Sequence, residues 1–359
     1  MPDLTTQYLP SYTMGPDAYQ AIPAICSRLG SKVVVIGGER ALAAARPALH
    51  PVLGEGDLEV LGVLVYGHEA TFDNVGRLAS EGAVAAADVI VAVGGGKCMD
   101  TCKTLGNRLG RPVLTLPTIA SNCAPVSAIS IMYNDDGSYR ETVELPGPAA
   151  HCFINTQVIA DAPDRYLWAG IGDTLAKHYE VSFKMRGDEL DYPRQLGLAI
   201  STMCADPLAA SAPSALADAR AHRATSGLES VVATIVVSTG LVSGLVGQTY
   251  NCALAHSLYY GLTSIATVAD EHLHGEVVAY GLLVQLVLDK QDDALRKLLG
   301  TYRETGLPTR LGDIGLSFDD DLSGALEVAA SHKDLAHTPY RISARMILSA
   351  MRELDGRQG

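Results

Sequence analysis

The sequence predicts a chain in two parts: an α/β half with a mostly parallel sheet over residues 1–160, and an all-helical half over residues 161–359. Short apolar runs that end in glycine alternate with helical stretches in the first half, as in βαβ units. These runs are apolar throughout, which is typical of strands covered on both faces. After residue 160 the spacing of apolar residues is helical almost everywhere.

The elements of the first half follow one another in a regular order. Strands are expected at 32–38 (KVVVIGG), 58–67, 87–96 (ADVIVAVGGG) and 111–118 (RPVLTLPT), and helices at 39–50, 71–86 and 97–110. Residues 127–145 read as a hairpin with Asp136 and Gly137 at its turn, because an Asp-Gly pair suits the positive φ angles of tight hairpin turns.

The second half begins with a helical stretch over 162–187. The segment 206–227 is rich in alanine and proline and is expected to be a loop between helices. Residues 230–269 contain no Asp, Glu, Lys or Arg. This length could suggest a membrane span, but the many Ser, Thr and Gly residues, together with Asn251 and His256, favour buried helices around a polar centre.

Composition and charge exclude several classes of protein. Apolar residues make up 48% of the 359 residues and charged residues 19%, which indicates a well-packed globular chain. The net charge of -13 argues against a nucleic-acid partner. Seven scattered cysteines without a CxxC pair indicate reduced thiols. With no signal-peptide pattern at the N-terminus, we expect a cytoplasmic location.

The first candidate site is the glycine run at Gly94, Gly95 and Gly96, between an expected strand and an expected helix. Glycines let the backbone approach a pyrophosphate, and the following helix supplies N–H donors. The run is neither a Walker A loop, because Cys98 stands where Ser or Thr is required, nor a GxGxxG motif. A tight strand-to-helix turn is the alternative.

The second candidate site is a set of three residues in the helical half: Asp173, His256 and His274. One Asp and two His can hold a divalent ion such as zinc or iron(II) and leave positions open for water or substrate. The alternatives are a helix cap for Asp173 and hydrogen-bonded core histidines. His272, two residues from His274, competes with it.

These motifs come in one order, and together they resemble a known family. GGGKxxD after a strand, PTIASNCAPVSAIS, GIGDTLAK, ALAHSLYYG and HGEVVAYG resemble the glycerol dehydrogenase branch of the iron-containing (group III) alcohol dehydrogenases. The resemblance covers nearly the whole chain. The dehydroquinate synthases are more distant relatives that share the fold.

The resemblance implies an N-terminal NAD(P)-binding domain, a helical metal-binding domain and an active site in a cleft. It implies metal ligation by Asp173, His256 and His274. It also implies a set of cofactor contacts: Gly94, Gly95, Gly96 and Lys97 at the pyrophosphate with Asp100 nearby, and Thr118, Ser121, Ser127, Ile129 and Tyr133 toward the nicotinamide.

The chain departs from the family pattern at two positions. Some members have a fourth ligand, a His one helical turn after the Asp. Lys177 stands there, and His178 faces about 100° away, which favours a three-ligand, zinc-type site over an iron-type site. Glycerol dehydrogenases resembling this chain have Asp where Cys123 stands. A neutral side chain at this position repels an anionic substrate less than a carboxylate would, and it binds a polyol less well.

The sequence therefore predicts a metal-dependent, NAD(P)-linked dehydrogenase of short 2-hydroxy or 2-oxo acids, similar to the hydroxycarboxylate dehydrogenases. The alternatives are a glycerol or vicinal-diol dehydrogenase and, more remotely, a dehydroquinate synthase-like lyase. Gly38 would not exclude the 2′-phosphate of NADP, and Arg40 could pair with it, whereas Glu39 could bind the ribose of NAD. Lys177 could meet a substrate carboxylate, and His272 could relay a proton. We expect a homo-oligomer with a small-molecule substrate and no membrane partner.

Overall fold

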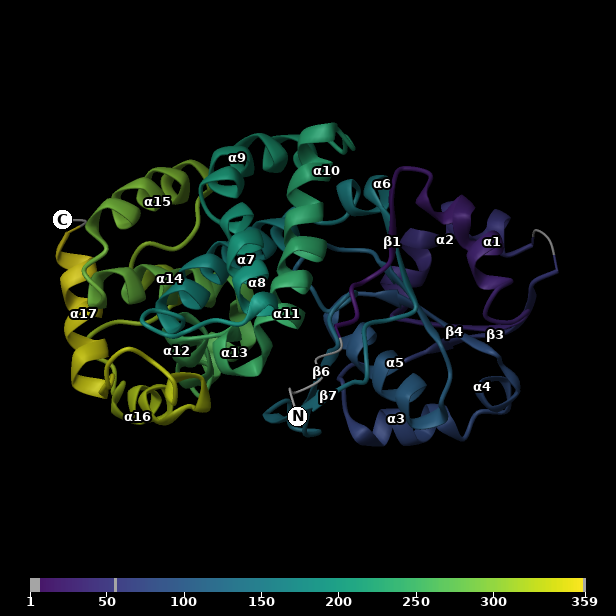
Figure 1. Ribbon diagram of the computed structural model, residues 1–359, viewed down its shortest axis with the longest axis horizontal. Helices are drawn as coiled ribbons and strands as arrows, with labels where there is room; N and C mark the ends of the chain where they lie inside the picture. The colour runs from purple at the N-terminus through teal and green to yellow at the C-terminus, as the bar shows by residue number, and fades with distance from the viewer. Residues whose placement is uncertain (1–6, 55–56, 358–359) are drawn as a thin grey trace. The chain divides into compact units, whose positions relative to one another are not determined.

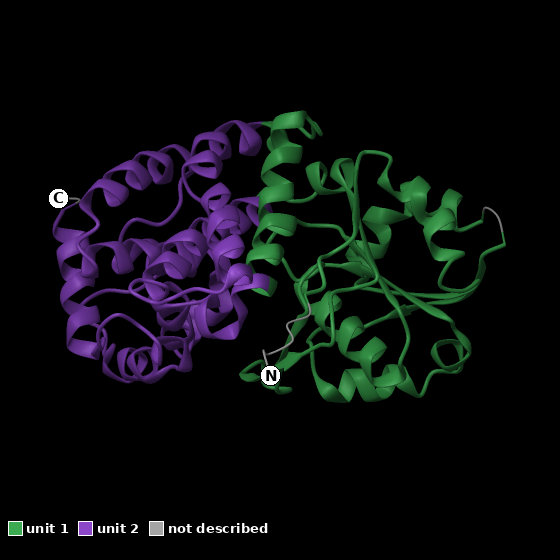
Figure 2. Cartoon of the chain, in the orientation of Figure 1, with its two compact units in different colours: residues 1–164, 218–244 green, residues 165–217, 245–359 purple. Residues whose placement is uncertain are grey.

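The computed structural model describes residues 7–54 and 57–357, and the chain divides into two compact units. Unit 1 comprises residues 1–164 and 218–244, and unit 2 comprises residues 165–217 and 245–359 (Figure 2). The expected α/β half thus lies in unit 1, but the chain returns to that unit for residues 218–244. The assignment of a cofactor to one unit and a metal to the other stays a prediction.

Unit 1 is an α/β unit built on a six-stranded sheet (Figure 1). Its strands are β1 (Tyr12–Gly15), β2 (Lys32–Gly37), β3 (Glu59–Val65), β4 (Val89–Gly94), β5 (Val113–Pro117) and β8 (His151–Asn155). They run parallel in the order β1-β8-β5-β4-β2-β3. The mostly parallel sheet is confirmed. The short strands β1 and β8 were not expected; they pair with each other at one side of the sheet.

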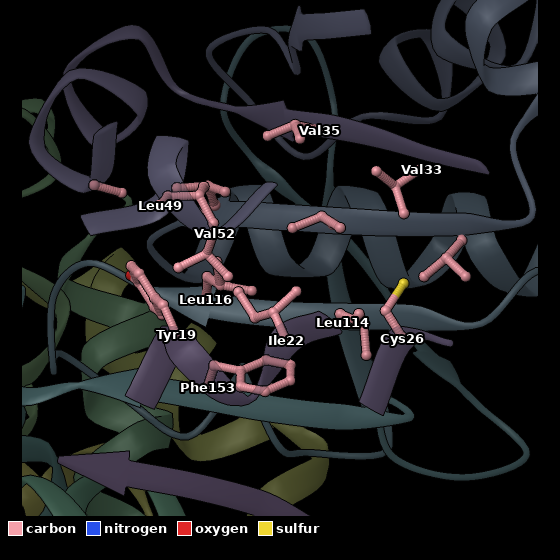
Figure 3. Close-up of a cluster of buried hydrophobic side chains, with 14 of the residues drawn as sticks. Tyr19, Ile22, Cys26, Val33, Val35, Leu49, Val52, Leu114, Leu116 and Phe153 are labelled. Carbon is pink, nitrogen blue, oxygen red and sulfur yellow. The ribbon is translucent and has the colours of Figure 1, made fainter. Parts of the chain in front are cut away.

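Helices cover both faces of this sheet. Since successive residues of a strand point to opposite sides, each strand contributes apolar side chains to both faces. The helices are η1 (Ala18–Ala21), α1 (Ile22–Cys26), α2 (Glu39–Leu53), α3 (Phe72–Ala79), α4 (Gly82–Ala86), α5 (Gly96–Leu109) and α6 (Thr156–Ala160). Val33 and Val35 of β2 join a core with α1 and α2 (Figure 3). Val34 and Ile36 join a second core with α3, α4 and α5. The uniformly apolar strand is therefore explained by burial on both sides.

A separate two-stranded sheet follows β5. β6 (Ile129–Tyr133) and β7 (Tyr139–Glu144) pair antiparallel. The expected hairpin is confirmed, with Gly137 at φ 82° in its turn. Unit 1 is completed by α10 (Ser226–Ala233), the π-helical turn η3 (Thr234–Ser238) and the first part of α11 (Thr239–Asn251).

Unit 2 is entirely helical in its described residues. Its helices are α7 (Arg165–Lys184), α8 (Tyr192–Ser201), η2 (Thr202–Cys204), most of α9 (Asp206–Arg220), the end of α11, α12 (Leu254–Leu262), α13 (Ala266–Glu271), α14 (His274–Leu288), α15 (Asp292–Thr305), η4 (Leu311–Ile314), α16 (Ser323–Ser331), η5 (Lys333–Leu335) and α17 (Ala344–Gly356). Helices α7 and α12 both pack on α14.

Two expectations for the second half have different outcomes. The expected loop at 206–227 is wrong: residues 206–220 form α9, because alanine has a high helix propensity and Pro207 lies in the first turn, where proline is tolerated. The charge-free stretch is helical and buried, as expected. Residues 226–251 are long and apolar enough to cross a membrane, but 72% of their most apolar window is buried inside the protein, which is typical of a core helix.

Candidate functional site

The glycine run lies at the switch point of the parallel sheet. β2 connects to β3 on one side, whereas β4 pairs with β2 on the other side. Ligands of open parallel sheets bind outside the carboxyl ends of the strands at such a point. β2 ends at Gly37 and β4 at Gly94, so both glycine-containing turns lie at this position.

The turn after β4 leads directly into a helix. Gly95 is the N-cap residue of α5, and no side chain caps this helix end among the described residues. A Cβ atom on Gly96 would lie 2.8 Å from the side-chain nitrogen of Asn122. The backbone amide of Thr118 donates to the carbonyl of Gly94 at 3.1 Å. The glycine run and the segment after β5 therefore lie together, as a cofactor site would require.

Lys97 and Tyr133 extend this group. The ammonium group of Lys97 lies 5.6 Å from the ring centroid of Tyr133 and pairs with Glu69. The side chain of Lys97 is 53% exposed, so it can reach a phosphate near the glycine run. Ser121 is half-buried in the segment after β5.

Three other predicted cofactor residues converge on a buried lysine that sequence reasoning missed. Lys103 lies 3.2 Å from Asp100 and donates to the hydroxyl of Ser127 at 3.1 Å and to the carbonyl of Ile129. Burial raises the pKa of the Asp100 carboxyl group despite the nearby Lys103. These contacts hold the hairpin against α5. The cofactor contacts expected of Asp100, Ser127 and Ile129 stay predictions.

Cys123 is half-buried in the segment between β5 and β6. Its carbonyl oxygen accepts hydrogen bonds from the amides of Val126 and Ser127, both at 3.0 Å. Cys123 and Val126 both pack on α11, because a Cβ atom on Gly240 would lie 3.6 Å from the Cβ of Cys123 and 2.3 Å from Cγ2 of Val126. The turn thus fixes the backbone of Cys123.

The three predicted metal ligands come together within unit 2. Asp173 lies on α7, His256 on α12 and His274 at the first residue of α14. Oδ1 of Asp173 lies 3.2 Å from Nε2 of His256 and 3.4 Å from Nε2 of His274. Ligands about 2.0–2.2 Å from a tetrahedral ion are separated from one another by roughly 3.3 Å. The three donors therefore fit a divalent ion.

Close helix packing produces this convergence. A Cβ atom on Gly275 would lie 1.9 Å from the carbonyl oxygen of Ala169, so only glycine allows α14 to approach α7 this closely. A Cβ atom on Gly281 would lie 2.6 Å from the carbonyl oxygen of Ala255, one residue before His256. The two glycines of the HGEVVAYG motif thus bring α7 and α12 up to α14.

The electrostatics of the cluster favour a cation. Burial alone would raise the pKa of the Asp173 carboxyl group, but hydrogen bonds from His256 and His274 hold it well below its usual value. The side chain of His274 is 36% exposed, whereas those of Asp173 and His256 are each 8% exposed. The site thus combines a buried ionised carboxylate with one accessible side, where a substrate could enter.

Around these ligands lie residues whose roles the sequence did not indicate clearly. The buried carboxylate of Glu180 contacts Nδ1 of His256 at 2.6 Å. Lys177 is 4% exposed and donates to Asn251, so its cation is not directed at solvent. His272 lies 2.9 Å from Glu276 through Nδ1. The only sequence signal for Glu180 was its position seven residues after Asp173, which places both side chains on the same side of α7.

Comparison with known proteins identifies the family. The family model for iron-containing alcohol dehydrogenase matches residues 10–152. Hydroxycarboxylate dehydrogenase A of Escherichia coli is 36% identical over 309 residues, which cover 86% of this chain and 82% of that protein. The chain belongs to the iron-containing alcohol dehydrogenase family and is an oxidoreductase.

Two glycerol dehydrogenases are also similar to this chain, one in sequence and one in structure. The glycerol dehydrogenase of Thermotoga maritima is 32% identical over 300 residues, covering 81% of this chain and 80% of that protein. The crystal structure of glycerol dehydrogenase from Schizosaccharomyces pombe superimposes with a TM-score of 0.87 at 27% identity, covering 99% of this chain and 91% of that one. Dehydrogenases of this family use NAD(H) and a divalent metal. The predicted fold class is confirmed.

Proposed function

We propose that this enzyme reduces short 2-oxo acids and oxidises the corresponding 2-hydroxy acids, with NAD(P) as the hydride carrier. The observation that carries the proposal is Cys123, a half-buried neutral side chain at the position where the resembling glycerol dehydrogenases have a carboxylate. A carboxylate would repel an anionic substrate and accept hydrogen bonds from a diol, and a thiol does neither strongly.

The reaction needs a hydride, a proton and a polarised carbonyl group. A 2-oxo acid, NAD(P)H and one proton give a 2-hydroxy acid and NAD(P)⁺. Asp173, His256 and His274 would hold a divalent ion. Zinc is favoured over iron because Lys177 stands where some family members have a fourth ligand, a His. Such an ion acts as a Lewis acid toward the substrate oxygen. The glycine run, Lys97 and the segment after β5 would position the cofactor for hydride transfer.

A second function has equal support from the comparisons: oxidation of glycerol or another vicinal diol, as the name of the Thermotoga maritima relative indicates for that protein. Initial rates with 2-oxobutyrate and NAD(P)H, set against rates with glycerol and NAD(P)⁺, separate the two. Efficient glycerol oxidation without reduction of 2-oxobutyrate would refute the oxo-acid proposal. A dehydroquinate synthase-like lyase would show no net change at the NADH absorbance band.

The proposal extends to the choice between NADH and NADPH, the location in the cell and the oligomeric state. NADPH should be accepted, because Gly38 leaves open the position at which an acid would exclude the 2′-phosphate. We also propose a cytoplasmic location, with which the free cysteines agree, and a homo-oligomer. Light scattering of the purified protein measures the oligomer, and removal of the ion with a chelator should abolish activity.

A further inference from the structure

The feature that carries a further inference is the carboxylate of Glu180 on α7, whose side chain is 0% exposed. Its two oxygens contact the same stretch of α12. Oε1 accepts hydrogen bonds from the amides of Ala253 at 2.8 Å and His256 at 3.0 Å. Oε2 lies 2.6 Å from Nδ1 of His256. One carboxylate thus binds both the backbone and the imidazole of a single residue.

The backbone contacts replace a missing helix cap. α12 begins after Ala253, whose methyl side chain cannot accept a hydrogen bond from the first turn. Glu180 supplies that acceptor from α7, and its negative charge suits the amino end of α12. Because the second capped amide belongs to His256, the cap fixes the position of this residue along the helix.

The imidazole contact selects a tautomer. An ionised carboxylate can only accept a hydrogen bond, so Nδ1 of His256 must carry the proton that it donates. Nε2 is then the ring nitrogen that faces Asp173, 3.2 Å away, and it is the nitrogen available to a cation that displaces its proton. We propose that Glu180 is the positioning residue of the metal site: it holds His256 in the tautomer and orientation that ligation through Nε2 requires. This inference rests on the proposed metal-dependent function.

The contacts of Glu180 are those of an ionised carboxylate, because its two oxygens accept hydrogen bonds from two backbone amides and face an imidazole nitrogen. Asp173, Lys177 and Glu180 follow one another at positions i, i+4 and i+7 of α7, and all three are buried. A buried carboxylate that contacts both the ring and the backbone amide of a metal-binding histidine is typical of residues that orient metal ligands.

The Glu180→Gln substitution tests this role with little change in shape. Whichever way the amide is oriented, its NH₂ group faces either the capped backbone N–H groups or the Nδ1–H of His256. With the NH₂ group toward Nδ1, His256 can satisfy the amide only by moving its proton to Nε2, which removes the ligand lone pair; with the NH₂ group toward the backbone, the amides of Ala253 and His256 lose their acceptor. We expect zinc affinity to fall about 10- to 100-fold.

A matched control is available at the same end of α12. Oε1 of the fully buried Gln285 accepts from the amide of Leu254 at 3.0 Å, without contacting an imidazole. Gln285→Met should loosen the start of α12 and lower the melting temperature while leaving zinc affinity within about 3-fold of wild type. Affinity of the metal-free proteins is measured by competition with a chromophoric chelator, and ligand geometry from the visible spectrum of bound Co²⁺.

The outcomes separate the two proposals. Wild-type protein that binds neither Zn²⁺ nor Co²⁺ would refute the metal-dependent function itself. Wild-type affinity retained in Glu180→Gln, or an equal loss in Gln285→Met, would refute the positioning role alone. If Glu180→Gln does not fold, Glu180→Asp replaces it, because Asp keeps the charge but has a shorter side chain. The proposal then requires that Glu180→Asp binds zinc more weakly than Gln285→Met does.

Discussion

The ammonium group of Lys177 lies 3.0 Å from the backbone oxygen and 3.0 Å from the side-chain oxygen of Asn251, in the interior of unit 2. Lys177 stands one helical turn after Asp173, where a fourth metal ligand would be. Its charge faces the Asn251 oxygens and the carboxylate of Glu180. This lysine is therefore placed to stabilise the protein rather than to bind a substrate carboxylate.

Lys177→Met should accordingly lower the free energy of unfolding by about 1–3 kcal/mol, because it leaves the buried oxygens of Asn251 without their donor and removes a cation near the buried carboxylate of Glu180. The KM for 2-oxobutyrate should stay close to the wild-type value. Urea denaturation and steady-state kinetics measure the two effects. Lys297→Met, at a 67% exposed ion pair on α15, is the control and should change stability by less than about 0.5 kcal/mol. A large rise in KM at unchanged stability would instead indicate a substrate contact.

Cys123→Asp should move substrate preference from 2-oxo acids toward diols. The introduced carboxylate repels an anionic substrate and accepts hydrogen bonds from hydroxyl groups. We expect kcat/KM for 2-oxobutyrate to fall by about 10- to 100-fold while that for glycerol rises, since one such interaction is worth roughly 1.5–3 kcal/mol. Cys123→Ser, which stays neutral, should keep the wild-type preference. An unchanged ratio in the Asp variant would show that this position does not set specificity.

Gly38→Asp should make the enzyme more selective for NADH. Gly38 is the extended N-cap residue of α2, and a Cβ atom there would meet only the ring of Tyr66 at 3.5 Å, an ordinary contact. The added carboxylate can bind a ribose hydroxyl but repels a 2′-phosphate. The ratio of kcat/KM for NADH over NADPH should rise at least about 10-fold. Gly38→Asn, without the charge, is the control, and an equal ratio in both variants would contradict the prediction.

Gly275→Ala should separate α7 from α14 and disrupt the metal site. The new methyl group would overlap the carbonyl oxygen of Ala169, which the backbone cannot relieve without moving a helix. We expect a loss of at least about 1–3 kcal/mol in stability together with weaker zinc binding. Gly300→Ala, at an open position of α15, should instead stabilise the protein by up to about 1 kcal/mol. Calorimetry with and without zinc distinguishes the two, and unimpaired zinc binding by Gly275→Ala would refute the packing argument.

Asp289→Asn should destabilise the protein at neutral pH but not in acid. Burial would raise the pKa of the Asp289 carboxyl group, but hydrogen bonds from Arg186, Gln291 and Tyr340 lower it below 3.8. A lowered native pKa contributes stability above the ordinary pKa, and this stability is lost as the pH falls through the native value. The difference in unfolding free energy between wild type and variant should be constant above about pH 5 and shrink below pH 4. A difference independent of pH would contradict this assignment.

The fold and the ligand cluster could be predicted because they depend on patterns that are local in sequence. The apolar strands predicted a sheet covered on both faces. The order of the motifs identified Asp173, His256 and His274 as one set of candidate ligands. Strand β1 could not be predicted, because four residues with exposed or half-buried side chains carry little periodicity. Helix α9 was not predicted, because its prolines were taken to indicate a loop although its alanines favour a helix.

The residues around the site were harder to predict, for a different physical reason. Glu180, Lys177 and Lys103 resemble ordinary surface charges in the sequence, and charged residues are rarely buried without partners. Their burial depends on hydrogen-bond acceptors and donors that are supplied by distant segments: Asn251 and Ala253 for α7, and Ser127 for α5. Such pairings are known only once the helices are packed.

The return of residues 218–244 to unit 1 has a consequence for how the chain is made. The hydroxyl of Thr156 donates to Glu229 at 3.0 Å, so unit 1 uses partners that leave the ribosome only after residues 165–217 of unit 2. Unit 1 therefore cannot complete its contacts until residues 165–217 of unit 2 have been synthesised. A single cut after residue 164 would leave the first fragment without α10, whereas the second fragment would contain all of unit 2 together with residues 218–244 of unit 1.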